Sequence, residues 1–329
     1  KIGMGHAFRQ ISFALTAMKA GYSPIILTDS EIVAKCADKS NVKNLLIKIK
    51  NKDSLSELLK HLRPSFVVID VHEKDFPNYS WVANYWRTQL IVSRVCHDFD
   101  LYGENVFFIG EDLNYWKVKK EKWIPNNLSK VKIYTGRAFI YFRKEFDIDL
   151  THLHKKIDNQ ILITHGGSNP NALTQKCLEA LQLTNNAYDI KVLVGPSFKD
   201  IDHIKILSKK SKHKCELLIG KTEVAEVMST SGIALINGGN TRYELCVTGT
   251  PFIALSLQEK QYKFTEQLTK EGAGINIGLY HKVSLEQLSK EIDQLYEDKI
   301  RLTEMKQKMI SFFDTRGNTR ILKIISKSF

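Results

Sequence analysis

Short apolar runs rich in β-branched residues alternate with amphipathic stretches along the whole chain, a pattern typical of parallel α/β units. In residues 8–20, Ile11, Leu15 and Met18 recur at helical spacing, which predicts a helix. Residues 54–57 read Ser-Leu-Ser-Glu, a capping box that predicts the start of a further helix at Ser54. The strands expected in this half are 24–28, 45–49, 66–70, 90–93, 106–110 and 138–142.

The second half repeats this alternation. Its expected strands are 160–164, 190–194, 216–218, 233–236, 252–255 and 275–277, and its expected helices are 171–183, 224–229, 241–247, 259–271 and 285–296. The polar stretch 147–159 has no core pattern and is the natural linker between two domains, 1–148 and 149–329. Because a doubly wound domain feeds its first glycine turn with a strand, we expect that strand upstream of residue 1.

Composition and length agree with two globular domains. The chain has 329 residues, of which 43% are hydrophobic and 10% aromatic. No apolar run reaches the length of a membrane helix, and the start lacks the features of a secretion signal, so we expect a cytoplasmic protein without a membrane span. The five cysteines form no CxxC pair, which favours free thiols over disulfides or structural zinc.

Charge and acidic pairs leave the choice of ligand open but exclude some classes. The net charge of +12 is spread over dispersed lysines and comes with no nucleic-acid-binding motif, so we expect no nucleic-acid partner. Three Asp-x-Asp triplets begin at Asp98, Asp147 and Asp200. None of them adjoins a glycine turn, so we interpret them as solvated loop residues and expect no metal requirement.

Three glycine turns, each leading into an expected helix, are the candidate sites of chemistry. They are Gly3-Met4-Gly5-His6, His165-Gly166-Gly167-Ser168 and Asn237-Gly238-Gly239-Asn240-Thr241. Glycine lets the backbone approach a ligand, and a helix start presents free N–H groups to a phosphate. None of the turns has the Walker ending or a complete GxGxxG, so ATP and nicotinamide are disfavoured and no cofactor is expected.

Five motifs in order resemble the UDP-sugar hydrolase of pseudaminic-acid biosynthesis and its spore-coat-polysaccharide relatives, over nearly the whole chain. The matching segments are Ile2-Gly3-Met4-Gly5-His6-Ala7-Phe8-Arg9, residues 139–146, residues 166–174, Gly238-Gly239-Asn240-Thr241 with Glu244 and Gly249-Thr250-Pro251, and residues 314–321. The resemblance implies a GT-B-like α/β fold, in which two Rossmann-like doubly wound domains face a cleft. It also implies a cytoplasmic, metal-independent, inverting enzyme that cleaves UDP from a diacetamido-trideoxy sugar.

Two departures from the family pattern fall near the reacting sugar. Where the hydrolases carry Asp-x-Tyr, this chain has Asp70-Val71-His72, and where they carry Asn-Gln it has Lys260-Gln261. The UDP-binding motifs are retained, whereas the residues that face the sugar are altered. We therefore expect a substrate that differs from the usual one of the family.

The resemblance assigns roles to individual residues. His6 is the candidate general base, since an imidazole with an ordinary pKa near ~6.5 is largely neutral at cellular pH; the alternative is a helix cap or a ligand donor. The Glu244 carboxylate is expected to accept hydrogen bonds from the two ribose hydroxyls. The residues expected to bind substrate are Gly5, Arg9, Asp70, His72, Gly166, Gly167, Ser168, Gly238, Gly239, Asn240, Thr241, Glu244, Lys260 and Gln261.

Three functions remain open from the sequence. The first is hydrolysis of a UDP-sugar to free sugar and UDP. The second is a GT-B glycosyltransferase that uses the same donor with an acceptor in place of water. The third is a non-catalytic nucleotide-sugar-binding module. His165 and Arg143 are expected to be structural, as a packed residue and as a hinge ion pair.

Overall fold

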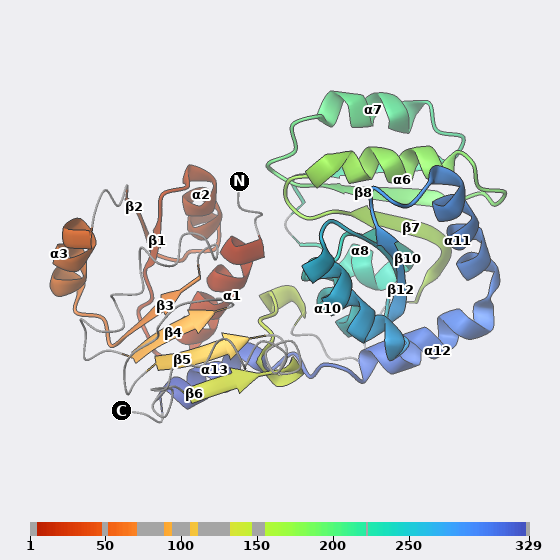
Figure 1. The fold of residues 1–329 in the computed structure, drawn as a ribbon. Helices are drawn as coiled ribbons and strands as arrows, with labels where there is room; N and C mark the ends of the chain where they lie inside the picture. Colours follow the sequence, from red (N-terminus) through yellow and green to blue (C-terminus); the bar gives the residue numbers. More distant parts are fainter. Residues whose placement is uncertain are drawn as a thin grey trace. The chain divides into compact units, whose positions relative to one another are not determined.

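The computed structural model describes residues 5–47, 52–70, 89–93, 106–110, 132–146, 155–221 and 223–326. These residues form two compact units, and the chain passes from the first to the second between Lys144 and Glu145 (Figure 1). The predicted linker 147–159 lies in part outside the described residues, and its last residues belong to the first strand of the second unit.

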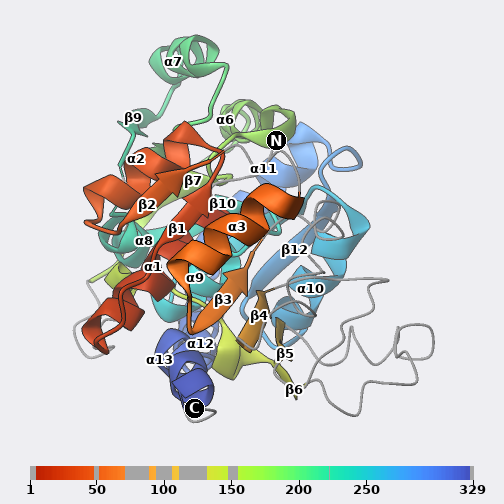
Figure 2. The same ribbon diagram turned by 90° about the vertical axis from the view of Figure 1, so that its left-hand side faces the viewer.

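Both sheets of the first unit are parallel, as the alternating pattern predicts. Figure 2 shows β3, β4, β5 and β6 side by side, and the shorter β1 and β2 form a separate pair. The elements of this unit up to the last strand are α1 (Gly5–Lys19), β1 (Ile26–Thr28), α2 (Glu31–Lys39), β2 (Asn44–Leu46), α3 (Lys52–Leu62), β3 (Phe66–Ile69), β4 (Gln89–Ser93), β5 (Val106–Gly110) and β6 (Lys132–Thr135).

Two local predictions for this unit are wrong. The strand expected at 138–142 is replaced by β6 and a short 3-10 helix, Arg137–Phe139, because Gly136 adopts a φ of +98° and turns the chain away from the sheet. The capping box at 54–57 does not begin a helix, because α3 begins two residues earlier and Ser54 lies inside it.

The C-terminal segment corrects the expected domain division. Residues 315–326 belong to the first unit, not to a second domain that runs to the end of the chain. In this segment α13 (Gly317–Ser326) packs Ile321 and Ile325 against Phe13 of α1. Asn318 Nδ2 donates to Ser12 Oγ and to the carbonyl of Phe142, both at 3.0 Å. The start of α13 lies directly against the backbone of Ile140, since a Cβ on Gly317 would lie 2.0 Å from the carbonyl oxygen of Ile140.

The second unit contains a six-stranded parallel sheet in the order β12-β11-β10-β7-β8-β9. Each strand predicted for this half is present. The strands are β7 (Ile157–Thr164), β8 (Asp189–Val194), β9 (Lys214–Ile219), β10 (Ser231–Ile236), β11 (Phe252–Ser256) and β12 (Gly274–Leu279). The central residues of β7, β8, β10 and β11 are mostly buried, which explains their apolar runs in the sequence, whereas those of the edge strands β9 and β12 are partly exposed.

Helices pack on the sheet of the second unit (Figure 1). Side chains of α6, α7 and α11 join one large core with alternate residues of β7, β8, β10 and β11. The helices are α6 (Leu173–Leu181), α7 (Ile201–Lys209), α8 (Ala225–Thr230), α9 (Thr241–Val247), α10 (Glu259–Lys270), α11 (Leu285–Glu297) and α12 (Lys299–Ile310). The sequence pattern located five of them and missed α7 and α12.

Candidate functional site

The two glycine turns of the second unit lie next to each other at the carboxyl edge of the sheet. One follows β7 and the other follows β10, and these strands are direct neighbours in register. The side chain of Asn237 joins the turns, because its Nδ2 donates to the carbonyl of His165 across 3.3 Å. Ligands of open α/β sheets bind at this edge. Gly166, Gly167, Ser168, Gly238 and Gly239 therefore come together as predicted from the sequence.

The turn after β7 is fixed against the end of β8. Gly166 has a φ of +78°, which favours glycine. The backbone N–H of Ser197 donates to the carbonyl of Gly167 at 2.9 Å, and a Cβ on Gly195 would lie only 2.5 Å from the Gly167 Cα. Asn169 continues the turn in the left-handed region and accepts from the N–H of Thr174 at 2.9 Å. Gly167 is thus held in place while Gly166 remains exposed.

A buried arginine shapes the turn after β10. Arg242, only 2% exposed, donates from Nη1 to the carbonyls of Gly238 and Gly239 at 2.5 and 2.8 Å. Its guanidinium lies over the ring of Tyr243, 4.3 Å from the centroid. The residue was missed in the sequence analysis, although an arginine inside a short apolar helix is a usable signal. Because both carbonyls point at Arg242, the turn has one defined shape.

The polar residues predicted to bind the nucleotide share one side of α9. Arg242, Tyr243, Leu245, Cys246 and Val247 are buried, whereas Asn240, Thr241 and Glu244 are partly exposed. Glu244 lies three and four residues after Thr241 and Asn240, a spacing that places side chains on the same helix face. The structure therefore brings these three predicted residues together beside the glycine turns.

Gln261 lies against the same turn from α10. A Cβ on Gly238 would meet Gln261 Cβ at 2.9 Å and Thr265 Oγ1 at 2.8 Å, so this position requires glycine. The Oε1 of Gln261 accepts from the N–H of Leu257 at 2.9 Å, so this oxygen is already hydrogen-bonded to the backbone just before α10. The side chain of Lys260 lies outside the described residues. A groove of about 570 Å³ elsewhere in this unit, lined by Tyr262, Lys282 and Lys290 among others, contains none of the predicted site residues.

His165 is a packed residue, as the sequence suggested. It is 1% exposed, and its Nε2 lies 3.4 Å from the Sγ of Cys177. Burial lowers the pKa of His165 to about 3 and raises that of the Cys177 thiol to about 12. Both groups are therefore neutral at physiological pH.

Acid should destabilise the second unit through His165. The pKa of His165 is lower in the folded state than in the unfolded state, where it is about 6.5. Keeping the imidazole neutral therefore stabilises the folded state above pH 6.5, and this stability is lost as the pH falls toward 3. We expect a loss of about 1.4 kcal/mol per pH unit below 6.5 from this residue. Urea denaturation followed by circular dichroism at pH 7 and pH 5 measures it. His165→Leu is the control and should lose less stability over this interval; equal losses would contradict the prediction.

In the first unit the structure pairs two of the predicted substrate residues with each other. Asp70 directly follows β3 and forms a two-pronged ion pair with Arg9 of α1, with Arg9 Nε 2.5 Å from Asp70 Oδ2. Gln10 Nε2 donates to the same carboxylate at 2.7 Å. His6 lies in the first turn of α1, and its side chain is outside the described residues, as is His72. The substrate roles of these four residues remain predictions.

Within the described residues, no group of three or more histidine, cysteine, aspartate or glutamate side chains is arranged to hold a metal ion. Over the same part of the chain, no helix has the length and apolar character needed to cross a membrane.

The two parallel α/β units define a GT-B-like protein, and comparison with solved structures shows the same fold. MurG of Acinetobacter baumannii superposes with a TM-score of 0.68 at 16% identity, covering 98% of this chain and 96% of that one. Anabaena HepE, solved in complex with UDP and glucose, gives 0.65 at 10% identity, with 98% and 96% covered.

The sequence places the chain in a family. Residues 149–321, more than half of the chain, match the glycosyltransferase family 28 C-terminal domain, so the chain belongs to that family. The spore coat polysaccharide biosynthesis protein SpsG of Bacillus subtilis is 24% identical over 169 residues, which cover 50% of this chain and 48% of SpsG. The chain spans about half the length of the curated relatives it matches.

Proposed function

We propose that the chain is a GT-B glycosyltransferase that binds a UDP-sugar through its second unit and transfers the sugar to an acceptor in polysaccharide biosynthesis. The observation that carries this proposal is the meeting of two glycine turns and the polar side of α9 at one sheet edge, within the family 28 domain. The HepE structure, which contains UDP, supports the choice of nucleotide.

The proposed roles follow from the chemistry of each group. Backbone N–H groups of the two turns, with Ser168, Asn240 and Thr241, bind the diphosphate. The Glu244 carboxylate accepts from both ribose hydroxyls, which a neutral amide could not match in strength. Arg242 keeps its turn in the shape that presents these groups. The diphosphate is then the leaving group, and the same donors stabilise the charge that develops on it.

The test is a panel of UDP-sugars incubated with the protein, with and without candidate glycan acceptors, while UDP release is followed. A transferase releases UDP mainly when an acceptor is present. Binding of a UDP-sugar without release under any condition would instead identify a non-catalytic module. Failure to bind every member of the panel would contradict the proposal.

Hydrolysis is the second candidate. The resemblance of the sequence motifs to the UDP-sugar hydrolases favours it, whereas the family 28 domain and the GT-B neighbours favour transfer. In the same assay a hydrolase releases UDP at the full rate without any acceptor, with water as the nucleophile. A 2,4-diacetamido-2,4,6-trideoxy sugar in the panel tests the substrate class that the resemblance implies.

Glu244→Ala should weaken UDP binding by about 1–3 kcal/mol, because it removes a charge-assisted pair of hydrogen bonds. Isothermal calorimetry with UDP measures the change. Glu286→Ala is the matched control, since Glu286 is an exposed glutamate in the first turn of α11. We expect this control to bind UDP like the wild type. Equal UDP affinity of the Glu244 variant and the wild type would show that the ribose assignment is wrong.

A further inference from the structure

The turn that ends α9 receives a lysine from another part of the chain. Thr248 caps the helix, and Gly249 follows with a φ of +58°. This segment includes the motif Gly249-Thr250-Pro251, which plays no part in the proposed nucleotide contacts. Lys156, immediately before β7, donates from Nζ to the carbonyl of Thr248 at 3.1 Å and to the hydroxyl of Thr250.

The same amino group also reaches α8. Lys156 Nζ lies 3.5 Å from the carbonyl oxygen of Met228, which accepts in addition from the Thr250 hydroxyl at 2.5 Å. Since that hydroxyl has one proton and gives it to Met228, it accepts from Lys156. One side chain therefore connects the end of α9 with the last turn of α8, through acceptors that lie where helix carbonyls lack partners in their own helix.

We propose that Lys156 is a positioning residue for nucleotide-sugar binding, because it fixes the far end of α9 and thereby the residues at its near end. This inference rests on the proposed function. α9 spans only seven residues, Thr241–Val247, so a displacement at Thr248 is transmitted to Asn240, Thr241 and Glu244. These are the three residues whose partly exposed side chains lie beside the glycine turns.

The charge around Lys156 gives the connection a pH dependence. Burial and the nearby Lys306 of α12 lower the pKa of Lys156 to about 6. Lys306 packs over the turn, since a Cβ on Gly249 would lie 3.1 Å from its Cγ. The groups that α8 and α9 direct at Lys156 are carbonyl and hydroxyl oxygens. An ammonium group offers three N–H donors to these three acceptors, whereas the neutral amine offers two.

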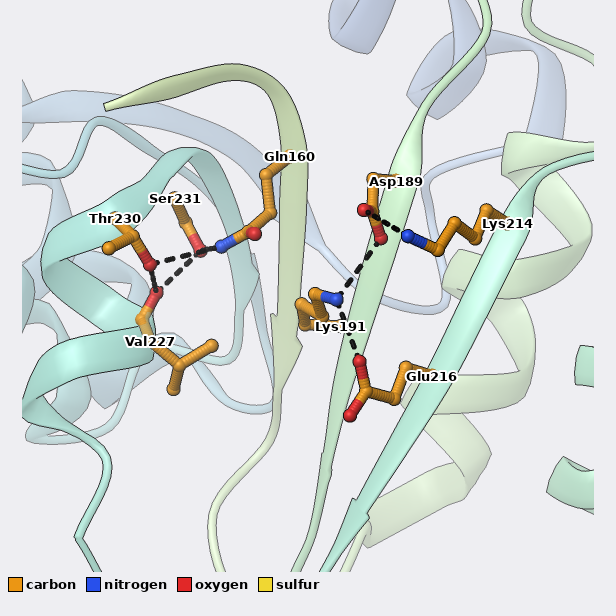
Figure 3. Close-up of polar contacts among 8 residues, drawn as sticks. All are labelled: Gln160, Asp189, Lys191, Lys214, Glu216, Val227, Thr230 and Ser231. Atoms are coloured by element: carbon orange, nitrogen blue, oxygen red, sulfur yellow. Dashed lines mark hydrogen bonds and ion pairs between the residues drawn. The ribbon is translucent and has the colours of Figure 1, made fainter. Parts of the chain in front are cut away.

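A side chain of β7 itself provides a matched comparison. Gln160 Nε2 donates to Thr230 Oγ1 at 3.2 Å and to Ser231 Oγ at 2.9 Å (Figure 3). Ser231 Oγ in turn donates to the carbonyl of Val227 at 2.6 Å. This network connects β7 with the end of α8 and the start of β10, and none of its hydrogen bonds among the described residues reaches α9. Loss of Gln160 should therefore affect stability without moving the nucleotide residues.

The experiment compares the wild type with Lys156→Met, Lys156→Gln, Gln160→Leu and Lys155→Met, the last being the exposed neighbour. Hydrogen exchange of residues 239–247 is measured without ligand. Calorimetry with UDP-glucose is run from pH 5 to pH 8, since its doubly esterified diphosphate does not titrate there.

For Lys156→Met we expect the exchange rate of residues 239–247 and the Kd for UDP-glucose to rise about tenfold at pH 5. The difference in Kd between Lys156→Met and the wild type should become smaller as the pH rises through 6. Lys156→Gln, which also cannot titrate here but can still donate, should show a smaller rise at pH 5, and the inflection near pH 6 should appear in the wild-type Kd and in neither Lys156 variant. Gln160→Leu should lower Tm only, and Lys155→Met should match the wild type.

A solely structural role of Lys156 predicts a lower Tm with unchanged Kd, or a change in Kd that is the same at every pH. Either result, or an equal effect of Gln160→Leu on Kd, would overturn the inference. If Lys156→Met does not fold, Lys156→Gln and its pH profile decide. If the wild type binds no UDP-glucose, that result counts against the proposed UDP-sugar binding and not against the positioning role of Lys156. In that case the exchange data still test the positioning: increased exchange at 239–247 confined to the Lys156 variants supports it, and unchanged exchange refutes it.

Discussion

Replacing Asp70 with alanine is expected to destabilise the first unit by about 3–5 kcal/mol, the usual result of removing one partner of a buried ion pair. The side chains of Arg9 and Asp70 are only 4% and 3% exposed. Without the carboxylate, the guanidinium loses two charge-assisted hydrogen bonds, and Gln10 loses its bond to the same group. This is the largest stability effect that we predict for a single substitution.

Urea denaturation followed by circular dichroism is the appropriate measurement. The control is the double variant Arg9→Met with Asp70→Leu, which replaces the ion pair by apolar groups and should be more stable than Asp70→Ala alone. A loss below 1 kcal/mol for Asp70→Ala would show that the ion pair contributes little to the fold.

The sheet of the second unit was predictable because burial leaves a strong local pattern. Strands covered on both faces read as continuous apolar runs, and Ile161, Leu162 and Ile163 of β7 are at most 1% exposed. The helix at 241–247 was predicted with its observed bounds, since a glycine turn marks its start and Gly249 its end. Local signals at both ends of an element make its position readable from sequence.

Prediction was less successful in the first unit because its errors depend on tertiary contacts. Phe139 and Tyr141 form part of an apolar run that resembles a strand, yet they pack against α1 and α13 from a 3-10 helix and the segment that follows it. Nothing local in residues 315–326 tells which unit that segment joins. The choice depends on the fit of Gly317 and Asn318 against residues about 180 and 310 positions earlier. Such long-range partners leave no periodicity in a single sequence.

The candidate site also contains residues that could be predicted from the sequence and residues that could not. Its glycine turns and the partly exposed Asn240, Thr241 and Glu244 could be found from sequence because a ligand site on a sheet edge needs residues of these types at these turns. The roles of Arg242 and Lys156 could not be assigned in this way, although an arginine in a short apolar helix marks Arg242 as unusual. Both bind backbone carbonyls, which every residue carries, so their partners have no signature in the sequence.

His6→Ala is expected to lower turnover by a factor of roughly 10²–10⁴, the usual contribution of a general base. His6 is the second residue of α1, in the first turn of that helix. In the transferase it would take the proton from the acceptor hydroxyl, and in the hydrolase from water. In both reactions the proton leaves the nucleophile as the bond to the anomeric carbon forms, so the substitution should reduce kcat whichever nucleophile is used.

The measurement is steady-state UDP release with a UDP-sugar that the wild type turns over, over a range of pH. His61→Ala is the matched control, because His61 is an exposed histidine of α3 in the same unit. UDP affinity should be nearly unchanged in His6→Ala, since the proposed UDP contacts belong to the second unit. A general base also predicts that the acidic limb of the wild-type rate profile disappears in the variant. If kcat falls and that limb persists, His6 binds substrate without carrying the proton. If UDP affinity falls as far as kcat, the separation of nucleotide binding from base catalysis between the two units is wrong.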